Sequence, residues 1–356
     1  MPWSWLPVPL ARSAAGSGRR RVLITGGAGF IGSTLGDALL ALGNEVTALD
    51  NLSTGTLANL DHALRHPSFT FIEGDIRNAR LVERVVAGYD AVVHLAARIG
   101  LRLVIESPTE TIESNVRGTE VVLKAAARHG TRTIVASTSE VYGLSTHHPS
   151  SESDPITFGS PTRGRWSYAC SKACNESLAL ALQRERGLPA TVVRLFNTVG
   201  PRQSARYGMV LSRFVRQALS GEPLTVYGDG TQTRSFCHVS DVLDALTTLI
   251  DRPVGVGDVF NIGNPAEITV LDLARTVIAR TGSASGITFV PFADVFGDGF
   301  EEIERRVPDI TKARAELGFS PSRTLESVID EIARAVSGVP RREAALSLAM
   351  AGHHDV

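Results

Sequence analysis

One pattern limits what this chain can fold into more than any other: short apolar runs alternate with segments of helical spacing. The first run, RVLIT (residues 21–25), leads into the glycine-rich turn GGAGFIG and then into STLGDALLALG, which has helical spacing. Further apolar runs occupy residues 45–50, 69–75, 91–96, 132–137 and 189–197, with helices expected at 78–87, 106–129 and 165–187. Buried parallel strands separated by helices are typical of a doubly wound sheet. The sequence predicts the α/β class, with a Rossmann-type doubly wound parallel sheet.

After about residue 200 the expected strands become short and scattered. We expect strands in LTVYG, RSFCHV, DVFNIG and ITFVPF, and helices at residues 207–220, 240–251, 269–281 and 322–337. This pattern indicates a smaller α/β lobe that caps the carboxyl edge of the main sheet. A cleft between two such lobes is the expected ligand site.

Composition limits the kind of partner. The 356 residues are 43% apolar and 21% charged, and no block of like charge points to a nucleic-acid or membrane partner. The sequence has no run of 18 apolar residues, so we expect no membrane span. Neither a CxxC pair nor a metal-type spacing occurs, so we expect no metal, and the three cysteines without a disulfide framework fit a reducing, cytoplasmic compartment. The expected ligand is a small molecule.

The glycine-rich turn has the context of a phosphate-binding loop. Gly26, Gly29 and Gly32 lie between a strand and a helix, where backbone N–H groups and the positive helix end approach a pyrophosphate. Asp50 ends the second apolar run, where a carboxylate accepts hydrogen bonds from both ribose hydroxyls and repels a 2′-phosphate. This favours NAD over NADP. Asp75, after the third run, is a candidate adenine contact and equally a candidate helix N-cap.

The stretch YACSK places Tyr168 and Lys172 four residues apart, on one face of a helix. Tyrosine is a weak base at neutral pH, because its pKa is about 10. A lysine cation one turn away and the charge of a bound nicotinamide would favour the phenolate. We therefore expect Tyr168 to remove a proton from a substrate alcohol while a hydride leaves for NAD.

Four stretches together, TGGAGFIG, HLAA, STSEVYG and YACSK, resemble the extended short-chain dehydrogenase/reductase family, which modifies nucleotide sugars. The resemblance covers about residues 21–338. It implies a nucleotide-sugar substrate, a tightly held NAD, transient oxidation at sugar C4 and a homodimer. It also implies that Thr138 bonds the C4 oxygen and that Asn197 contacts the substrate diphosphate. The cofactor contacts that it implies further are Phe30, Ile31, Asn51, Thr54, Gly55, Ile76, Leu95, Ala96, Ala97 and Asn115.

The same resemblance assigns the nucleotide end of the substrate to the second half of the chain. Tyr227 would lie near the base, Arg234 and Arg306 on the diphosphate, and Asp309 near the ribose. The physics agrees, because the planar fork of arginine suits phosphate.

Two arginines in PRQSARYG, Arg202 and Arg206, fit a substrate contact or a loop role equally well. The expected division of the chain is a flexible leader (1–20), a mainly NAD-binding Rossmann domain (21–200), a mainly nucleotide-sugar-binding lobe (201–338) and a flexible tail (339–356).

Glu140, which follows Thr138 and Ser139, decides between reactions. Epimerisation at C4 returns the hydride to the other face and needs no extra acid or base. A 4,6-dehydratase needs carboxyl groups to move protons at C5 and C6, and a decarboxylase acts on a uronic acid whose carboxylate is β to the new ketone. There Glu140 would repel the substrate carboxylate, or hold a water, or carry a proton to C5. Its alternative is a structural acid that orients neighbouring hydroxyls.

The order Thr–Ser–Glu together with NAD resembles UDP-glucuronate decarboxylases, as do RGRWSYACSK and PDITKARAELGF. Two loops depart from the xylose-forming enzymes, ARIGLRLVIESP and FGDGFEEIERR, and leave the sugar open. We interpret the chain first as a UDP-glucuronate decarboxylase in which Glu140, with Ser139, directs the chemistry at C5. The alternatives are a C4 epimerase acting on UDP-glucose or UDP-glucuronate, then a 4,6-dehydratase, and, as a different class, an NAD-holding module without chemistry.

Overall fold

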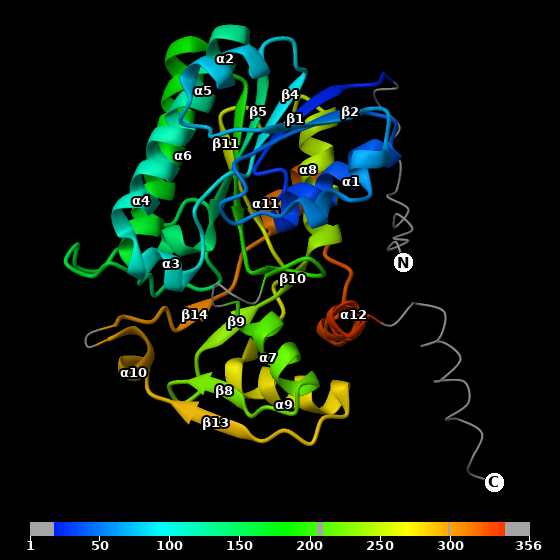
Figure 1. Cartoon of the computed structure of the whole chain (residues 1–356). Coiled ribbons are helices and arrows are strands. Elements are labelled where there is room, and N and C mark those ends of the chain that lie inside the picture. Colours follow the sequence, from blue (N-terminus) through cyan, green and yellow to red (C-terminus); the bar gives the residue numbers. More distant parts are fainter. Residues whose placement is uncertain (1–17, 205–208, 298–299, 339–356) are drawn as a thin grey trace.

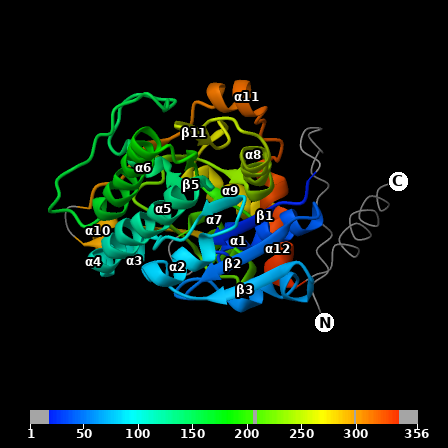
Figure 2. The same cartoon turned by 90° about the horizontal axis from the view of Figure 1, so that it is seen from above.

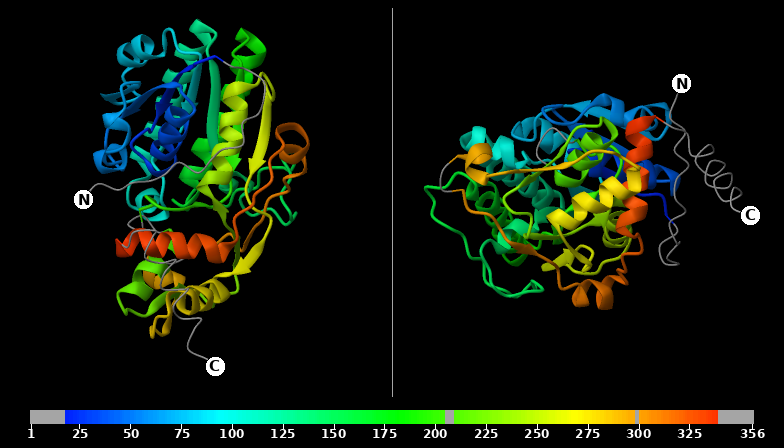
Figure 3. Two further views of the ribbon diagram at one scale, coloured as in Figure 1. Left: turned by 90° about the vertical axis from the view of Figure 1, so that its right-hand side faces the viewer. Right: turned by 90° about the horizontal axis from the view of Figure 1, so that it is seen from below.

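The computed structural model describes residues 18–204, 209–297 and 300–338. A large lobe built on a seven-stranded sheet lies above a smaller lobe in Figure 1, and Figure 3 shows α12 (Leu325–Ser337) lying across the region where the two lobes meet. Arg206, the tail and the leader up to residue 17 lie outside the described residues. No helix in the described ranges is both long and apolar enough to cross a membrane.

The large sheet is entirely parallel and has the strand order β3-β2-β1-β4-β5-β6-β11. The chain runs outward from β1 to β3 and then crosses to β4 on the other side of β1. The carboxyl ends of β1 and β4 therefore form a topological switch point, where ligands bind in such sheets. The predicted α/β class is confirmed. The strands are β1 (Arg21–Thr25), β2 (Glu45–Asp50), β3 (Phe69–Glu73), β4 (Ala91–His94), β5 (Arg132–Thr138), β6 (Ala190–Leu195) and β11 (Asp258–Ile262).

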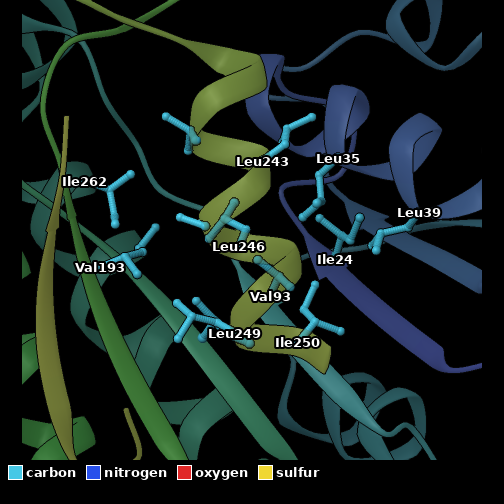
Figure 4. Packing of buried hydrophobic residues seen from close by; sticks show 14 of the residues in the cluster. Ile24, Leu35, Leu39, Val93, Val193, Leu243, Leu246, Leu249, Ile250 and Ile262 are labelled. Carbon is cyan, nitrogen blue, oxygen red and sulfur yellow. The ribbon is translucent and has the colours of Figure 1, made fainter. Parts of the chain in front are cut away.

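Helices cover both faces of this sheet (Figure 2). One face packs against α1 (Phe30–Ala41), α8 (Val239–Asp251) and α11 (Thr311–Leu317), and the other against α2 (Ala79–Val86), α5 (Gly118–His129) and α6 (Trp166–Arg186). Figure 4 shows the first contact, in which Leu246 and Ile250 of α8 lie against Ile24 and Val93 of the sheet. Because both faces are buried, the strands are continuous apolar runs rather than alternating ones.

The long helix expected at about residues 106–129 is present as one continuous helical run from Pro108 to His129, made of α4 (Pro108–Ile112), the π-helical turn η3 (Glu113–Arg117) and α5. A short helix that was not expected, α3 (Leu101–Glu106), precedes it. Pro108 lacks a backbone N–H and its ring clashes with a preceding helical turn, so the helix restarts at this residue. Apolar periodicity alone did not reveal α3 or the π-helical turn.

The strand expected in DVFNIG belongs to the large sheet and not to the smaller lobe, which corrects the expectation. As β11 it pairs in parallel with β6 from Asp258 to Ile262. The chain reaches it after α8, which has returned to the face of the large sheet. β11 covers an edge of β6 that would otherwise present unpaired backbone groups.

The smaller lobe has its own apolar core, formed mainly by α7 (Val210–Leu219), α9 (Val270–Thr281) and α12. The helices expected at residues 207–220, 269–281 and 322–337 are present in this lobe as α7, α9 and α12, each within a few residues of the predicted ends, whereas the helix expected at 240–251 is α8 and packs on the large sheet. The helix α9 starts where the Thr269 hydroxyl accepts a hydrogen bond from the Asp272 N–H, a side-chain N-cap. The remaining elements are β7 (Thr198–Val199), β8 (Leu224–Tyr227), β9 (Thr233–Ser235), β10 (Cys237–His238), β12 (Glu267–Thr269), β13 (Ile287–Val290), α10 (Phe292–Phe296), β14 (Arg305–Arg306) and the 3₁₀ turns η1 (Leu57–Leu60), η2 (Ala63–Arg65) and η4 (Ser139–Tyr142).

Candidate active site

A cavity of about 850 Å³ extends from the glycine-rich turn into the smaller lobe. Both lobes line it, so it occupies the predicted cleft and includes the switch point of the sheet. All the predicted catalytic side chains line it: Thr138, Ser139, Glu140, Tyr168 and Lys172.

The glycine-rich end of the cavity fits a dinucleotide. Gly26 has a φ of 73°, and a Cβ there would lie 2.7 Å from the Ala96 backbone nitrogen. A Cβ on Gly32 would lie 2.3 Å from the Gly26 carbonyl oxygen, so the turn has no room for side chains. Gly29 caps α1, whose first N–H groups have no partner within the helix and lie at its positive end. This is the geometry that a pyrophosphate requires.

Asp50 ends β2 beside this turn. One carboxylate oxygen accepts the Ala28 N–H at 3.0 Å and the other accepts the Leu52 N–H at 2.8 Å, so the side chain is held in place with lone pairs left for ribose hydroxyls. Burial raises the pKa of Asp50, and the two backbone hydrogen bonds oppose that effect. The arrangement supports NAD, whose ribose carries no 2′-phosphate.

Most of the predicted cofactor residues line the cavity, and Asn115 does not. Its side chain is buried behind the cavity wall, where it bonds the backbone of Arg98 and the Ser171 hydroxyl. Asp75 lines the cavity but is already bound by Arg77, whose hydrogen bonds lower the pKa of Asp75 to about 2. The other lining residues from the prediction are Gly26, Gly29, Phe30, Ile31, Asp50, Asn51, Thr54, Gly55, Ile76, Leu95, Ala96 and Ala97.

The Tyr–Lys pair lies on α6 and faces the end of β5. Tyr168 is 4% exposed, and its pKa is raised by burial first and by the Glu140 charge second, while Thr138 and Arg306 lower it. The Lys172 ammonium donates a hydrogen bond of 2.8 Å to the Ala136 carbonyl oxygen. Burial lowers the pKa of Lys172 to about 8. The groups of this chain therefore favour the neutral phenol, and a phenolate needs further positive charge from bound ligands.

Glu140 and Arg306 form an ion pair at the tyrosine end of the cavity, with a shortest N–O distance of 3.3 Å. Arg306 comes from β14 of the smaller lobe, 166 residues further along the chain. Its charge also acts on Tyr168. The sequence assigned Arg306 to the diphosphate, whereas the structure brings it to the predicted catalytic carboxylate.

Two more arginines lie near this pair. Arg234 bonds Glu302 at 3.0 Å, and Arg165 lies 3.6 Å from the same carboxylate. Burial, and then the charge of Arg306, lower the pKa of Arg234 to about 9. The sequence analysis did not assign Arg165 or Glu302, although Arg165 stands in RGRWSYACSK and Glu302 in the acidic loop that it noted.

The other end of the smaller lobe holds an aromatic group around Tyr227. Phe296 meets the Tyr227 ring edge-on at 5.6 Å, and the Arg213 guanidinium lies 4.0 Å from the ring centroid. The Gln232 amide donates to the Tyr227 carbonyl oxygen at 2.9 Å. Arg213 lines the cavity and has no carboxylate partner among the described residues. Sequence reasoning missed Arg213, because it lies on an amphipathic helix and in no motif.

The structure does not bring Asp309 to this cavity. Its carboxylate accepts the Thr311 N–H at 2.9 Å, at the start of α11, which corrects the expected ribose contact. Asn197 does line the cavity, and its amide donates to the Ser235 carbonyl oxygen. Arg202 lines it as well and pairs with Asp37 of α1 at 2.7 Å.

A parallel sheet with a glycine turn at its switch point, an acid at the ribose position and a buried Tyr–Lys pair define a dinucleotide-dependent enzyme. The chain belongs to the NAD dependent epimerase/dehydratase family, whose model matches residues 22–263. The chain is thus an enzyme, and its cofactor is NAD. The resemblance to the extended short-chain dehydrogenase/reductase family is confirmed.

Individual relatives are similar over most of this chain. It is 41% identical to a UDP-N-acetyl-alpha-D-glucosaminuronate decarboxylase of Bacillus cytotoxicus over 88% of this chain and 96% of that protein. It is 38% identical to UDP-glucuronic acid decarboxylase 1 of Danio rerio over 88% of this chain and 72% of the relative. The crystal structure of UDP-glucuronic acid 4-epimerase from Bacillus cereus, in complex with UDP-glucuronic acid and NAD, matches with a TM-score of 0.81 at 28% identity. That match covers 90% of this chain and 100% of that one.

Proposed function

We propose that this enzyme decarboxylates a UDP-linked uronic acid, with UDP-glucuronate as the first candidate substrate. The observation that carries the proposal is the Glu140–Arg306 ion pair beside Tyr168. A plain C4 epimerisation needs no such acid, and relatives at 38–41% identity are named as decarboxylases of UDP-uronic acids.

The charges around this end of the cavity support an anionic sugar. Arg165, Arg234 and Arg306 face the carboxylates of Glu140 and Glu302, so three cations against two anions leave one positive charge. Buried charge of one sign is costly unless it is paired. A sugar carboxylate beside the diphosphate supplies a partner that a neutral hexose lacks.

The proposed chemistry starts at C4. Tyr168 takes the proton of the C4 hydroxyl, and Thr138 holds the C4 oxygen. NAD, when bound, supplies the hydride acceptor and later returns the hydride. The C5 carboxylate is then β to a ketone, so the C5–C6 bond breaks, CO2 leaves, and the electron pair forms an enolate at C4 and C5. Arg306 stabilises that negative charge, and a proton adds to C5.

The role of Glu140 follows from its partner. A bare carboxylate would repel the carboxylate of the substrate, but the Arg306 cation compensates the charge of Glu140. This supports the reading in which Glu140, with Ser139 next to it, carries a proton or holds a water at C5, over the reading in which it works by repulsion.

At the nucleotide end we propose that Tyr227, Arg213 and Arg234 hold the nucleoside diphosphate and that Asn197 contacts its diphosphate. Arg213 is a largely buried cation whose pKa is lowered by burial, and a phosphate or a base carbonyl in the cavity would pair with its guanidinium.

The direct test is incubation of the purified enzyme with UDP-glucuronate and mass spectrometry of the product. Loss of the mass of one CO2 is expected. An isomer of unchanged mass would establish the C4 epimerase instead. UDP-N-acetylglucosaminuronate is the second substrate to assay, because the relative from Bacillus cytotoxicus is named for it. Loss of water from a dTDP- or GDP-hexose would establish a 4,6-dehydratase, and binding of NAD without any turnover would establish a binding module.

A second test isolates Glu140. In Glu140→Gln we expect reduction of NAD by UDP-glucuronate to persist while CO2 release falls roughly a hundredfold or more, because a general acid–base group is lost. Glu304→Gln, at an exposed carboxylate two residues before Arg306, is the matched control. Unchanged CO2 release in Glu140→Gln would contradict the role.

We further propose a cytoplasmic homodimer. The resemblance to the family supports the dimer, and free thiols at the exposed Cys170 and Cys174 and the buried Cys237 support a reducing compartment. Light scattering after gel filtration tests the mass, and a monomer at micromolar concentration would contradict it. We also retain the predicted domain limits, 21–200 and 201–338, except that β11, α8 and α11 belong to the large lobe.

A further inference from the structure

Three consecutive residues of β5 each contact one residue of α6, at intervals of one helical turn. The Ala136 carbonyl oxygen accepts from Lys172, the Ser137 hydroxyl donates to Glu176, and the Thr138 side chain lowers the pKa of Tyr168. Two of these contacts concern the proposed catalytic pair. The contact between Ser137 and Glu176 lies one turn further along α6. Ser137 also lines the cavity, whereas Glu176 lies outside its lining and has no role in the proposed chemistry.

Glu176 is held on its other side by a fully buried arginine. Arg194 on β6 donates to both carboxylate oxygens, with distances of 2.8 to 3.2 Å, and the two side chains are 6% and 5% exposed. Arg194 and Ser137 are register partners on adjacent parallel strands. The Glu176 carboxylate on α6 is therefore hydrogen-bonded by side chains from two neighbouring strands, β5 and β6. A buried ion pair is a poor source of stability in itself, which points to a positional use.

From these contacts we propose that Glu176, gripped by Arg194 and Ser137, is the positioning residue of the active site. It sets the height and rotation of α6 against β5, and through them the places of Tyr168 and Lys172. The inference rests on the proposed function, because it takes these two residues to be catalytic.

Hydrogen bonds also connect the Glu176–Arg194–Ser137 group, called the anchor below, to the segment that carries Arg306. Arg194 also donates to the Glu152 carbonyl oxygen at 3.2 Å, and the Glu152 carboxylate accepts the Asn261 N–H at 2.8 Å. The Asn261 amide in turn donates to the Asp309 carbonyl oxygen at 3.2 Å, three residues after Arg306. One buried polar network therefore connects the helix with the catalytic pair to the chain with the arginine that pairs with Glu140.

The position of Glu176 also matters electrostatically. The charged or titratable groups around Lys172 are His94 on β4, Tyr168 and Glu176 on its own helix, and Arg194 on β6 behind Glu176. Burial lowers the pKa of Lys172, and the charge of Glu176 opposes that effect. The pKa of His94 is itself lowered by burial, so the uncharged imidazole adds no further charge beside Lys172. Removing the carboxylate charge should leave Lys172 charged over a narrower pH range.

The test compares Ser137→Ala and Glu176→Gln with Thr191→Val in the full-length enzyme, using UDP-glucuronate. Thr191→Val removes a buried hydroxyl that donates to the Gly255 carbonyl oxygen at the far end of β6, so it matches the loss of a buried hydrogen bond without touching α6. We expect kcat to fall roughly ten- to a hundredfold in both anchor variants, since small displacements of catalytic groups have such effects. KM should stay within about twofold. In Glu176→Gln the alkaline limb of the kcat profile should also move to lower pH.

The outcomes separate the anchor from the proposed function. The positioning role is overturned if Ser137→Ala keeps the wild-type kcat and pH profile. It is also overturned if Ser137→Ala, like Thr191→Val, lowers only the free energy of unfolding. Ser137→Ala decides the question even if Glu176→Gln does not fold. If Tyr168→Phe remains active, the proposed function has failed instead. Loss of kcat in Ser137→Ala, with unchanged NAD binding and no such loss in Thr191→Val, supports the anchor.

Discussion

Tyr168 shows how far a single residue depends on its surroundings. The phenol is buried next to the negative charge of Glu140, and both raise its pKa. Among the residues that the structure describes, Thr138 and Arg306 act in the opposite direction. A tyrosine in this setting becomes a base only when positive charge is added to the cavity, so proton removal is coupled to ligand binding.

Tyr168→Phe is the first prediction at this scale. Loss of the hydroxyl should lower kcat by roughly a hundredfold or more, because the proton acceptor is absent. NAD binding should change little, since the phenyl ring keeps the packing. Turnover with UDP-glucuronate and fluorescence titration with NAD measure the two effects, and full activity in Tyr168→Phe would refute the assignment.

Arg213 gives a second residue-scale prediction. Arg213→Leu should raise the KM for a UDP-sugar by about tenfold or more and leave kcat close to the wild-type value, because a charge-assisted contact away from the reacting atoms is lost. Arg216→Ala, on the exposed side of the same helix, is the control. Equal KM values in Arg213→Leu and the wild type would exclude a nucleotide contact.

At the scale of elements, the turn between β1 and α1 is tightly packed against its own backbone. Gly32 is packed against the Gly26 carbonyl oxygen, whereas a Cβ on Gly36, one turn further along α1, would meet its nearest atoms at an ordinary 3.9 Å. Two glycines in one helix therefore have different reasons to be there. The first serves the phosphate turn, and the second does not.

Gly32→Ala should weaken NAD binding at least tenfold, because the new methyl group would displace the turn that faces the pyrophosphate. Gly36→Ala should leave NAD binding unchanged and stabilise the protein by about 0.5–1 kcal/mol, the usual effect of this change within a helix. Calorimetric titration and thermal unfolding measure the two quantities. Equal NAD affinities in the two variants would show that the turn does not bind the cofactor.

At the scale of the whole molecule, a buried histidine links folding to pH. His94 is fully buried and bonds the hydroxyls of Thr25 on β1 and Thr119 on α5, and burial lowers its pKa from 6.5 to about 3. Below pH 6.5 the unfolded chain binds a proton that the folded chain does not. The contribution of His94 is therefore complete above that pH and is lost as the pH falls towards 3.

We expect the free energy of unfolding to fall by up to about 1.4 kcal/mol per pH unit in this window on account of His94. His94→Gln, which keeps hydrogen-bonding atoms for both threonines but does not titrate, should show a shallower dependence. Urea unfolding between pH 7 and pH 4 measures the two slopes. Equal slopes would mean that other groups dominate acid unfolding.

Most strands of the large sheet, the glycine turn, Asp50 and the Tyr168–Lys172 pair could be predicted from the sequence, because each depends on residues close together in the chain. The short helix α3 before Pro108 was missed, because six residues are too few for apolar periodicity to indicate a helix.

The way in which distant segments combine became visible only in the folded molecule. It placed β11 in the large sheet, took Asp309 away from the cavity, brought Arg306 to Glu140 from 166 residues further along the chain, and set Arg194 behind the catalytic helix. The physical reason is that local spacing governs backbone geometry and hydrogen bonding within an element. The pairing of buried charges depends instead on which strands and lobes pack together, and no short stretch of sequence contains that information.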